Sequence, residues 1–397
     1  MAEAQATTLL PLHTHTIRVL EKAGLLNRAV EFLPNDADIA ERQRLGKGLT
    51  RPELAVLLSY AKIWLYEQIL ASNLPDDAFL QDDLLHYFPE ALQKKYAHEI
   101  AQHQLRREII ATGLTNDLVN RAGCHFMFAM MDRTGKTAID IARAYLIVRA
   151  SYDMPTLWDA IDKLDNKVSA ATQTMMLLAV NRTMNHVVPW FLSQAEMPLK
   201  LSNAIAQYRD GVERMTKWLG KNPSTLDTPS HRTMSELDER GVPETLSGRL
   251  AIMPYLAAAP DMTLLAEQSA CGIEQASSAF FGLGRRLGLD WLRERAESVT
   301  GIETPWQREA VALLLDDVFE SQRALASNMM GIKVSGDTKK GCHCDPLPAW
   351  TEKHAERLEH YDALLNELRA TGTLDLAMLT LASRHLSALV KRSCLVL

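Results

Sequence analysis

The densest group of side chains able to bind a metal ion is Cys342, His343 and Cys344, followed by Asp345. Thiolate and imidazole ligands together suit zinc. Adjacent residues reach one tetrahedral ion poorly, however, and no second Cys/His pair follows at the spacing of a zinc finger. We therefore interpret the segment as a loop with incidental thiols and assign no metal ligand in this chain. Metal binding by the three residues stays an open alternative.

Two glycine-containing segments resemble nucleotide-binding loops, but both are incomplete. Gly135-Lys136-Thr137 ends like a phosphate-binding loop, yet Met130 stands where such a loop requires its first glycine. Gly282 to Gly288 approaches a dinucleotide fingerprint, but its third glycine comes one residue late. No apolar strand precedes either segment, and a phosphate is bound only where strand, loop and helix occur together. We predict turns at both places and no cofactor-binding residue.

Several titratable side chains could act as acids, bases or ligands if the fold brought them together. His98 and His103 miss the four-residue spacing that puts two ligands on one helical face. The acidic pairs Asp76-Asp77 and Asp82-Asp83 are expected in a loop and in the first turn of a helix, where acids favour the helix dipole. A small-molecule enzyme would have to use His103, Arg106, Arg107 and Glu108 in one cleft. This is the weakest hypothesis, because the side chains of neighbouring residues in a helix mostly point in different directions.

The chain ends with Cys394-Leu395-Val396-Leu397, which formally fits a prenylation box. A four-residue pattern arises easily by chance. Only a eukaryotic cell, or a bacterial protein delivered into one, would carry the modification. We interpret the box as a chance match and keep a lipid anchor at Cys394 as an alternative.

Composition narrows the class of protein. The 397 residues are 47% hydrophobic and carry a net charge of -6, so the chain can bury a large core and offers no basic surface for a nucleic acid. Met1 to Leu12 lacks the basic start of a secretory signal, and Leu54 to Ala71 is too polar to span a bilayer. Five scattered cysteines suit a reducing compartment. We expect a cytoplasmic protein with neither a nucleic-acid partner nor a membrane partner.

Helical periodicity dominates the whole chain. Apolar residues recur at intervals of three and four from Leu54 to Leu65, which places them on one face of a helix. Thr50, Pro52 and Glu53 form the pattern of a capping box at the start of that helix. Strand-like alternation is scarce. The sequence therefore predicts an all-α fold, a multi-helix array with a C-terminal helical hairpin and no Rossmann sheet.

Breaks in the periodicity divide the chain into five parts. The first helical subdomain is expected over residues 1–219, with helices that include His98 to Thr112 and Asp117 to Met131. Prolines and polar residues indicate a linker or long loop over residues 220–243. A second helical subdomain is expected over residues 244–330. A second loop over residues 331–350 and a terminal hairpin with a tail over residues 351–397 follow.

A series of segments in a fixed order runs along the chain. The segments are Glu31 to Pro34, Gly46 to Ile63, Leu74 to Asp77, Tyr87 to Pro89, Leu105 to Thr112, Thr115-Asn116, Asn120-Arg121, Ala142 to Asn166 and Trp306 to Leu325. Together they resemble the C-terminal region of the large bacterial NAD-specific glutamate dehydrogenases. The residues that carry the likeness include Thr50, Arg51, Pro52, Glu53, Arg106, Arg107, Asn116 and Asn120, to which we assign structural roles. They span most of the chain, so the series is more specific than any single motif above.

The resemblance implies a reaction that this chain should not perform alone. The family oxidises glutamate to 2-oxoglutarate and ammonium and reduces NAD, using residues of a dehydrogenase core that precedes the helical region. No catalytic, cofactor-binding or metal residue carries over to this chain, so NAD is expected only for the intact enzyme. The implied partners are the dehydrogenase core and, in the intact enzyme, further subunits of a homo-oligomer. The competing hypothesis is an independent helical interaction module, with Cys394 as a possible lipid anchor.

Overall fold

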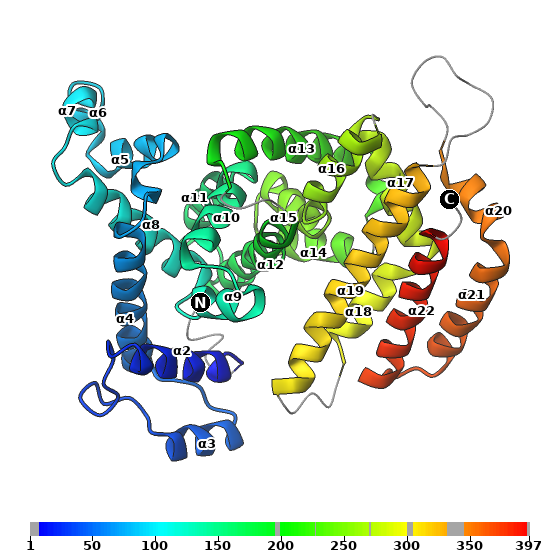
Figure 1. Cartoon of the computed structure of the whole chain (residues 1–397), viewed down its shortest axis with the longest axis horizontal. Coiled ribbons are helices and arrows are strands. Elements are labelled where there is room, and N and C mark those ends of the chain that lie inside the picture. The colour runs from blue at the N-terminus through cyan, green and yellow to red at the C-terminus, as the bar shows by residue number, and fades with distance from the viewer. Residues whose placement is uncertain are drawn as a thin grey trace. The chain divides into compact units, whose positions relative to one another are not determined.

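The computed structural model describes residues 8–194, 199–226, 228–269, 271–299, 305–331 and 345–394. These residues form helices joined by turns and loops, without a strand among them, which confirms the predicted all-α fold (Figure 1). The chain divides into two compact units. Unit 1 comprises Met1–Asp210 and Arg232–Ala257, and unit 2 comprises Gly211–His231 and Ala258–Leu397.

Unit 1 contains the N-terminal helices, drawn in blue to green in Figure 1. Two helices, α13 (Leu201–Lys221) and α14 (Thr228–Glu239), contribute residues to both units. Among the described residues, short 3₁₀ turns lie at Leu74–Asp76 and Ala78–Leu80 in unit 1 and at Pro223–Thr225 in unit 2. The helices wholly in unit 1 are α2 (Leu10–Lys22), α3 (Asp36–Arg44), α4 (Arg51–Leu70), α5 (Gln81–Tyr87), α6 (Glu90–Gln93), α7 (Ala97–Ala101), α8 (Arg106–Ala122), α9 (Phe126–Thr134), α10 (Ala138–Ser151), α11 (Met154–Asp162), α12 (Ala170–Gln194) and α15 (Glu244–Leu256).

Helix α4 begins at the predicted capping box. The backbone N–H of Thr50 donates to Glu53 Oε2 at 2.7 Å, and Pro52 lies in the first turn, where its missing N–H costs nothing. One face of the helix is buried against α2 and α8. That face consists of Leu54, Leu57, Ala61, Leu65 and Ile69.

Helix α10 lies at the centre of unit 1 and contacts α4, α9, α11 and α12. Most of its residues are buried, and they point in every direction around the helix axis rather than along one stripe. Its N-terminus is closed by a second capping box, in which Thr137 and Asp140 exchange hydrogen bonds of 3.2 Å. The capping residues Thr137 and Asp140, followed by mostly apolar residues, therefore determine where this buried helix begins.

Both helix ranges named in the sequence analysis were wrong. The segment predicted as one helix over His98 to Thr112 contains the end of α7 and the start of α8, with a turn from Gln102 to Leu105 between them. The predicted helix from Asp117 to Met131 is interrupted at Gly123, whose φ of +102° ends α8 before α9 begins. Apolar spacing continues across both breaks, which is why periodicity did not reveal them.

The two glycine-containing segments differ in outcome. Gly135 has φ +65° and ends α9, so the predicted turn at Gly135-Lys136-Thr137 is confirmed. Gly282 and Gly284 instead lie inside α17 (Ile273–Arg286), and the turn comes later, at Gly288 with φ +61°. A Cβ at Gly284 would lie 2.6 Å from Gln322 Nε2, so this glycine permits the close contact of α17 with α19 (Pro305–Met330).

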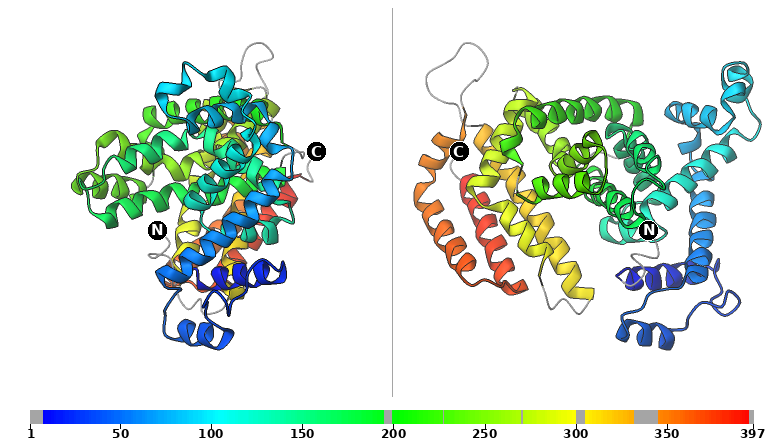
Figure 2. Two further views of the ribbon diagram at one scale, coloured as in Figure 1. Left: turned by 90° about the vertical axis from the view of Figure 1, so that its left-hand side faces the viewer. Right: turned by 180° about the vertical axis from the view of Figure 1, so that it is seen from behind.

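Unit 2 is organised around α19, which contacts α16, α17, α18 and α22. Figures 1 and 2 show α19, α22 and α21 side by side, and α21 with α22 forms the predicted terminal hairpin. The predicted linker over residues 220–243 includes a 3₁₀ turn and α14. The remaining helices of unit 2 are α16 (Ala259–Ser269), α17 (Ile273–Arg286), α18 (Leu289–Glu297), α19 (Pro305–Met330), α20 (Leu347–Lys353), α21 (Ala355–Ala370) and α22 (Leu376–Cys394).

Within unit 2, α21 is fixed to the end of α17 by polar contacts. Tyr361 Oη donates to the carbonyl oxygen of Leu287 at 3.0 Å, and Arg286 forms two hydrogen bonds with the Asp362 carboxylate at 2.9 and 2.8 Å. In the described part of the chain, no helix is both long and apolar enough to span a bilayer.

Candidate functional site

His98 and His103, the two histidines considered in the sequence analysis, both lie in unit 1. His98 is exposed on α7. His103 follows in the turn before α8, where its Nδ1 accepts a hydrogen bond from the Leu105 N–H at 3.1 Å and its ring lies 5.8 Å from that of Phe88. His98 therefore lies within α7, and His103 lies in the connection between α7 and α8.

Arg106 and Arg107 join α8 to the end of α4. The Arg107 guanidinium donates to the carbonyl oxygens of Leu70 at 2.9 Å and Ser72 at 2.8 Å, and it pairs with Asp76. Arg106 reaches the same carboxylate at 3.5 Å. A cation at the C-terminus of a helix satisfies carbonyl groups that have no intrahelical partner. The two arginines thus connect the start of α8 to the residues that follow α4.

The predicted acidic pairs provide partners for arginines of α10. Arg143, which is 7% exposed, donates to Asp77 Oδ2 at 3.2 Å, to Asn73 Oδ1 at 3.1 Å and to the Leu199 carbonyl at 3.3 Å. A buried cation must be paired and hydrogen-bonded to offset its lost hydration. Asp77 therefore compensates a buried charge here.

A second cluster surrounds Arg149, six residues further along α10. Its guanidinium contacts Asp83 Oδ2 at 2.6 Å and Asp117 Oδ2 at 3.0 Å, and Tyr145 Oη donates to the same Asp117 oxygen at 2.9 Å. Burial lowers the Arg149 pKa, but the two carboxylates outweigh burial and raise this pKa above its ordinary value. Burial and the Asp117 charge both raise the pKa of Tyr145. The cluster holds a permanent cation and a neutral phenol.

These α10 clusters were not predicted, although the sequence carried a signal for them. Arg143 and Arg149 interrupt an otherwise apolar helix, and a cation inside a buried helix demands an anion nearby. The candidates were the acids of Asp76-Asp77 and Asp82-Asp83, which precede α10 in the chain. Pairing the two sets requires knowing that α10 lies against that segment.

A different kind of site lies where α2 meets the start of α9. One ring nitrogen of His13, one of His125 and the Sγ of Cys124 all lie within 4.8 Å of one another. His13 is 2% exposed and Cys124 is 5% exposed. The two imidazole rings meet edge to face, with centroids 5.6 Å apart. Within the described ranges, this is the one group of three or more potential metal-binding side chains so close together.

Burial sets the protonation of this group. It lowers the pKa of His13 to about 4, and burial together with His13 lowers the pKa of His125 to about 4. Burial raises the pKa of the Cys124 thiol to about 12, despite the nearby backbone N–H groups. The Nδ1 atoms of both histidines are buried and have no hydrogen-bond partner. An unsatisfied buried polar atom is costly, about 1–3 kcal/mol each, so two together require an explanation.

The sequence signal for this group was weak. His13 belongs to the triplet His13-Thr14-His15, and Cys124-His125 is a simple dipeptide far along the chain. Only the fold brings α2 and α9 together. The predicted Cys342, His343 and Cys344 cluster lies outside the described residues, as does the side chain of Cys394.

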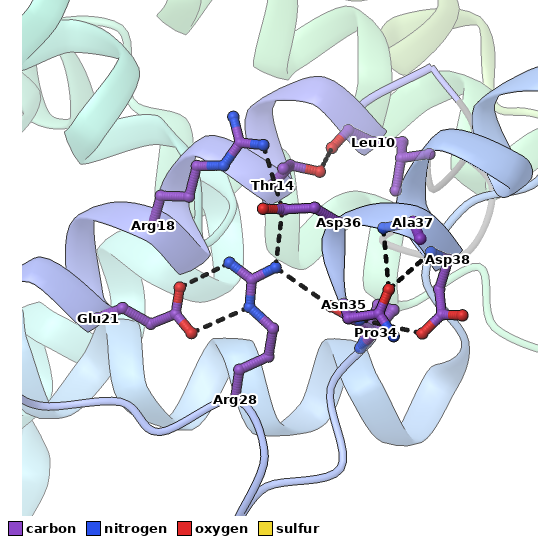
Figure 3. A network of polar contacts seen from close by, with 10 residues as sticks. All are labelled: Leu10, Thr14, Arg18, Glu21, Arg28, Pro34, Asn35, Asp36, Ala37 and Asp38. Carbon is purple, nitrogen blue, oxygen red and sulfur yellow. Dashed lines mark hydrogen bonds and ion pairs between the residues drawn. The ribbon is translucent and has the colours of Figure 1, made fainter.

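A polar network near the N-terminus fixes an exposed loop (Figure 3). Arg28 forms two hydrogen bonds with the Glu21 carboxylate at 2.9 and 2.6 Å and one with Asp36 at 2.9 Å, which joins α2 to the start of α3. The loop between them presents Val30, 65% exposed, and Phe32, 89% exposed with φ +53°. A phenylalanine is rarely held in this conformation and exposed at the same time.

Comparison with known proteins gives a consistent family. Residues 46–388 match the family model described as glutamate dehydrogenase, C-terminal. An NAD-specific glutamate dehydrogenase of Halomonas elongata is 32% identical over 93% of this chain and 23% of its own length. Enzymes of the same description from Pseudomonas aeruginosa and Mycobacterium tuberculosis are 31% and 30% identical over 99% of this chain and 24% of theirs.

The chain thus spans about a quarter of the length of these relatives. The matched region includes α4, α8 and α10, whose arginines and carboxylates form the contacts described above. By the extent of this match, the chain belongs to the glutamate dehydrogenase C-terminal family.

Proposed function

We propose that this chain is the C-terminal helical part of an NAD-dependent glutamate dehydrogenase. The intact enzyme would convert L-glutamate, NAD and water to 2-oxoglutarate, ammonium and NADH. The observation that carries the proposal is the continuous similarity to three NAD-specific glutamate dehydrogenases over 93–99% of this chain. A chance or single-motif similarity would not extend across both units.

The chain by itself is proposed to be non-catalytic. Its family-like polar residues, such as Arg107 and Asp77, are engaged in contacts between helices rather than directed at a common point. The proposal places glutamate and NAD on the dehydrogenase core, which corresponds to the larger remaining part of the relatives. The role of the helical region is then assembly with that core, in the cytoplasm and in a homo-oligomer.

The Val30–Phe32 loop is the proposed contact with the core. Its two apolar side chains are exposed, and Arg28 holds the loop ends to α2 and α3, so little conformational entropy is lost when a partner covers it. Burying one phenylalanine contributes about 1.5–3 kcal/mol. Aromatic residues, phenylalanine among them, are enriched at protein–protein interfaces.

The test uses the Pseudomonas aeruginosa enzyme truncated before the region that matches this chain. NADH formation from glutamate and NAD is followed with the truncated enzyme alone, with this chain alone and with the two mixed. We expect activity only in the mixture. Turnover by this chain alone would contradict the proposal, and silence of all three samples would favour the independent helical interaction module.

The docking loop is tested in the same mixture with Phe32→Ser. We expect the concentration of chain needed for half-maximal activity to rise by about tenfold or more, since one interface anchor contributes roughly 1.5–3 kcal/mol. The matched control is Leu381→Ser, which replaces a 46% exposed leucine on α22. Equal effects of the two variants would exclude the Val30–Phe32 loop as the specific contact.

A further inference from the structure

We propose that His13, Cys124 and His125 form a zinc-binding site that joins α2 to the α8–α9 turn. The three side chains come from two segments far apart in the sequence, and their potential ligand atoms already lie within 4.8 Å of one another. Two imidazoles and one thiol are the donor types that zinc prefers. The site is separate from the α10 arginine clusters and from the Val30–Phe32 loop.

The geometry requires only a small adjustment to close around an ion. Zinc bonds of about 2.0–2.3 Å in a tetrahedral arrangement place ligand atoms roughly 3.3–3.8 Å apart, so a contraction of about 1 Å suffices. Side-chain rotation of His13 and Cys124 can supply such a shift without moving a helix. The present separation is therefore within reach of a bound state.

Two buried nitrogen atoms point to a ligand rather than to ordinary core packing. Nδ1 of His13 and Nδ1 of His125 lack hydrogen-bond partners, although a buried imidazole normally satisfies its polar atoms. His13 is almost completely buried, so solvent does not compensate it. Coordination of a cation by one nitrogen of each ring would satisfy part of this unmet demand.

The backbone around the site is shaped for the His125 ring. A Cβ on Gly123 would lie 3.0 Å from His125 Cε1 and 3.1 Å from His125 Nδ1. Gly123 also has φ +102°, which L side chains rarely adopt. Beside the cluster, His15 Nε2 lies 2.6 Å from Asp132 Oδ2, so the same two helices, α2 and α9, are joined by a second contact.

The chemistry of binding is a simple exchange. Zinc forms a bond to the Cys124 sulfur as the thiol loses its proton to solvent, and neutral imidazole nitrogens of His13 and His125 supply two further bonds. Three protein ligands leave the fourth position of a tetrahedral ion for water. No oxidation or reduction takes place. The direct consequence is a metal cross-link between α2 and the α8–α9 turn.

The test measures metal binding to the full chain. The protein is purified, its zinc content is determined by mass spectrometry, and Co²⁺ is titrated into the metal-free form as a spectroscopic probe. We expect about one ion per chain and a thiolate-to-cobalt charge-transfer band. Absence of both zinc and cobalt binding would overturn the proposal.

Three variants and two controls identify the ligands. Cys124→Ser should abolish the charge-transfer band, and His13→Gln and His125→Gln should weaken metal affinity by about tenfold or more, since even loss of an outer partner costs about 10- to 100-fold. His15→Gln and Cys271→Ser are the matched controls on a neighbouring histidine and another free cysteine. Circular dichroism verifies that each variant is folded. Retention of the band in Cys124→Ser, or its loss in Cys271→Ser, would refute the assignment.

Discussion

At the scale of single residues, unit 1 depends on arginines buried within an apolar helix. Arg143 and Arg149 each combine carboxylate partners with a neutral polar group or carbonyl nearby. Such clusters add little net stability over an apolar core, but removal of one member leaves the other charges uncompensated. They specify how α10 lies against the segments that carry the acids.

Replacing Arg149 with methionine tests this dependence. Arg149→Met removes the cation and leaves Asp83 and Asp117, both only partly accessible to water, without their partner. We expect the free energy of unfolding of unit 1 to fall by about 2–4 kcal/mol, measured by urea denaturation. The control variant Lys163→Met breaks an exposed ion pair with Asp159 and should change the free energy of unfolding by less than about 1 kcal/mol. Comparable losses in the two variants would contradict the role assigned to burial.

His354 makes unit 2 sensitive to acid. Burial, with Arg357 and Lys353 nearby, lowers its pKa below 6.5, so the folded state favours the neutral ring. The unfolded chain therefore binds the proton more readily than the folded chain. The contribution of His354 to the free energy of unfolding is complete above pH 6.5 and is lost as the pH falls toward the pKa of the folded state. We expect the melting temperature of unit 2 to decrease on acidification over this range.

The variant His354→Phe separates this effect from other titrations. It keeps a ring against Trp350, whose centroid lies 4.9 Å from that of His354, but it cannot bind a proton. Thermal melts across the pH series should show a shallower dependence than in the unchanged chain. His385→Gln, at an exposed position of α22, is the control and should leave the dependence as it was. If the melting temperature of His354→Phe depended on pH as steeply as that of the unchanged chain, His354 would be excluded as the cause of the acid sensitivity.

At the scale of elements, the junction of α3 and α4 combines a helix cap with an ion pair. Glu53 accepts the Thr50 N–H at 2.7 Å and also binds Arg42 of α3 at 2.6 and 2.8 Å. We expect Glu53→Ala to cost about 2 kcal/mol, because it removes both interactions. Glu53→Gln retains an acceptor for Thr50 and should cost about half as much. Chemical denaturation of the two variants provides the measurement, and equal losses would show that the cap contributes little.

Local patterns were predictable, and contacts between distant segments were not. The Thr50 box, the Gly135 turn and the terminal hairpin follow from neighbouring residues, so sequence spacing identified them. The break at Gly123 was missed because apolar spacing continues through it. The pairing of His13 with Cys124 depends on α2 reaching α9, which no local pattern encodes.

At the scale of the whole molecule, the chain divides into two compact units. We expect calorimetry to show two transitions rather than one, since each unit buries its own apolar residues. Arg149→Met should lower the melting temperature of the unit 1 transition, and Gly284→Ala should lower that of the unit 2 transition. The alanine Cβ would meet Gln322 Nε2, which is held by the Phe280 carbonyl at 3.0 Å. A single transition lowered by both variants would contradict independent cores.

The family resemblance was recognised from the sequence because it rests on an ordered series of local segments. Residues 46–388 match the family model, and the segments quoted from Gly46 onward up to Leu325 fall inside it. The proposed contact through Phe32 could not be predicted from these segments, although Glu31 to Pro34 is one of them, because the exposure of Phe32 is a property of the fold.

The burial of α10 on all sides has a consequence for how this chain can vary. A helix with one solvent face accepts many substitutions there, whereas α10 is surrounded by α4, α9, α11 and α12. In saturation mutagenesis, its positions should tolerate the fewest amino-acid types in unit 1, with small residues such as Ala142 and Ala144 accepting almost none. Over evolutionary time, the rate of accepted change would then be lowest along α10 and highest on the exposed surface of α3.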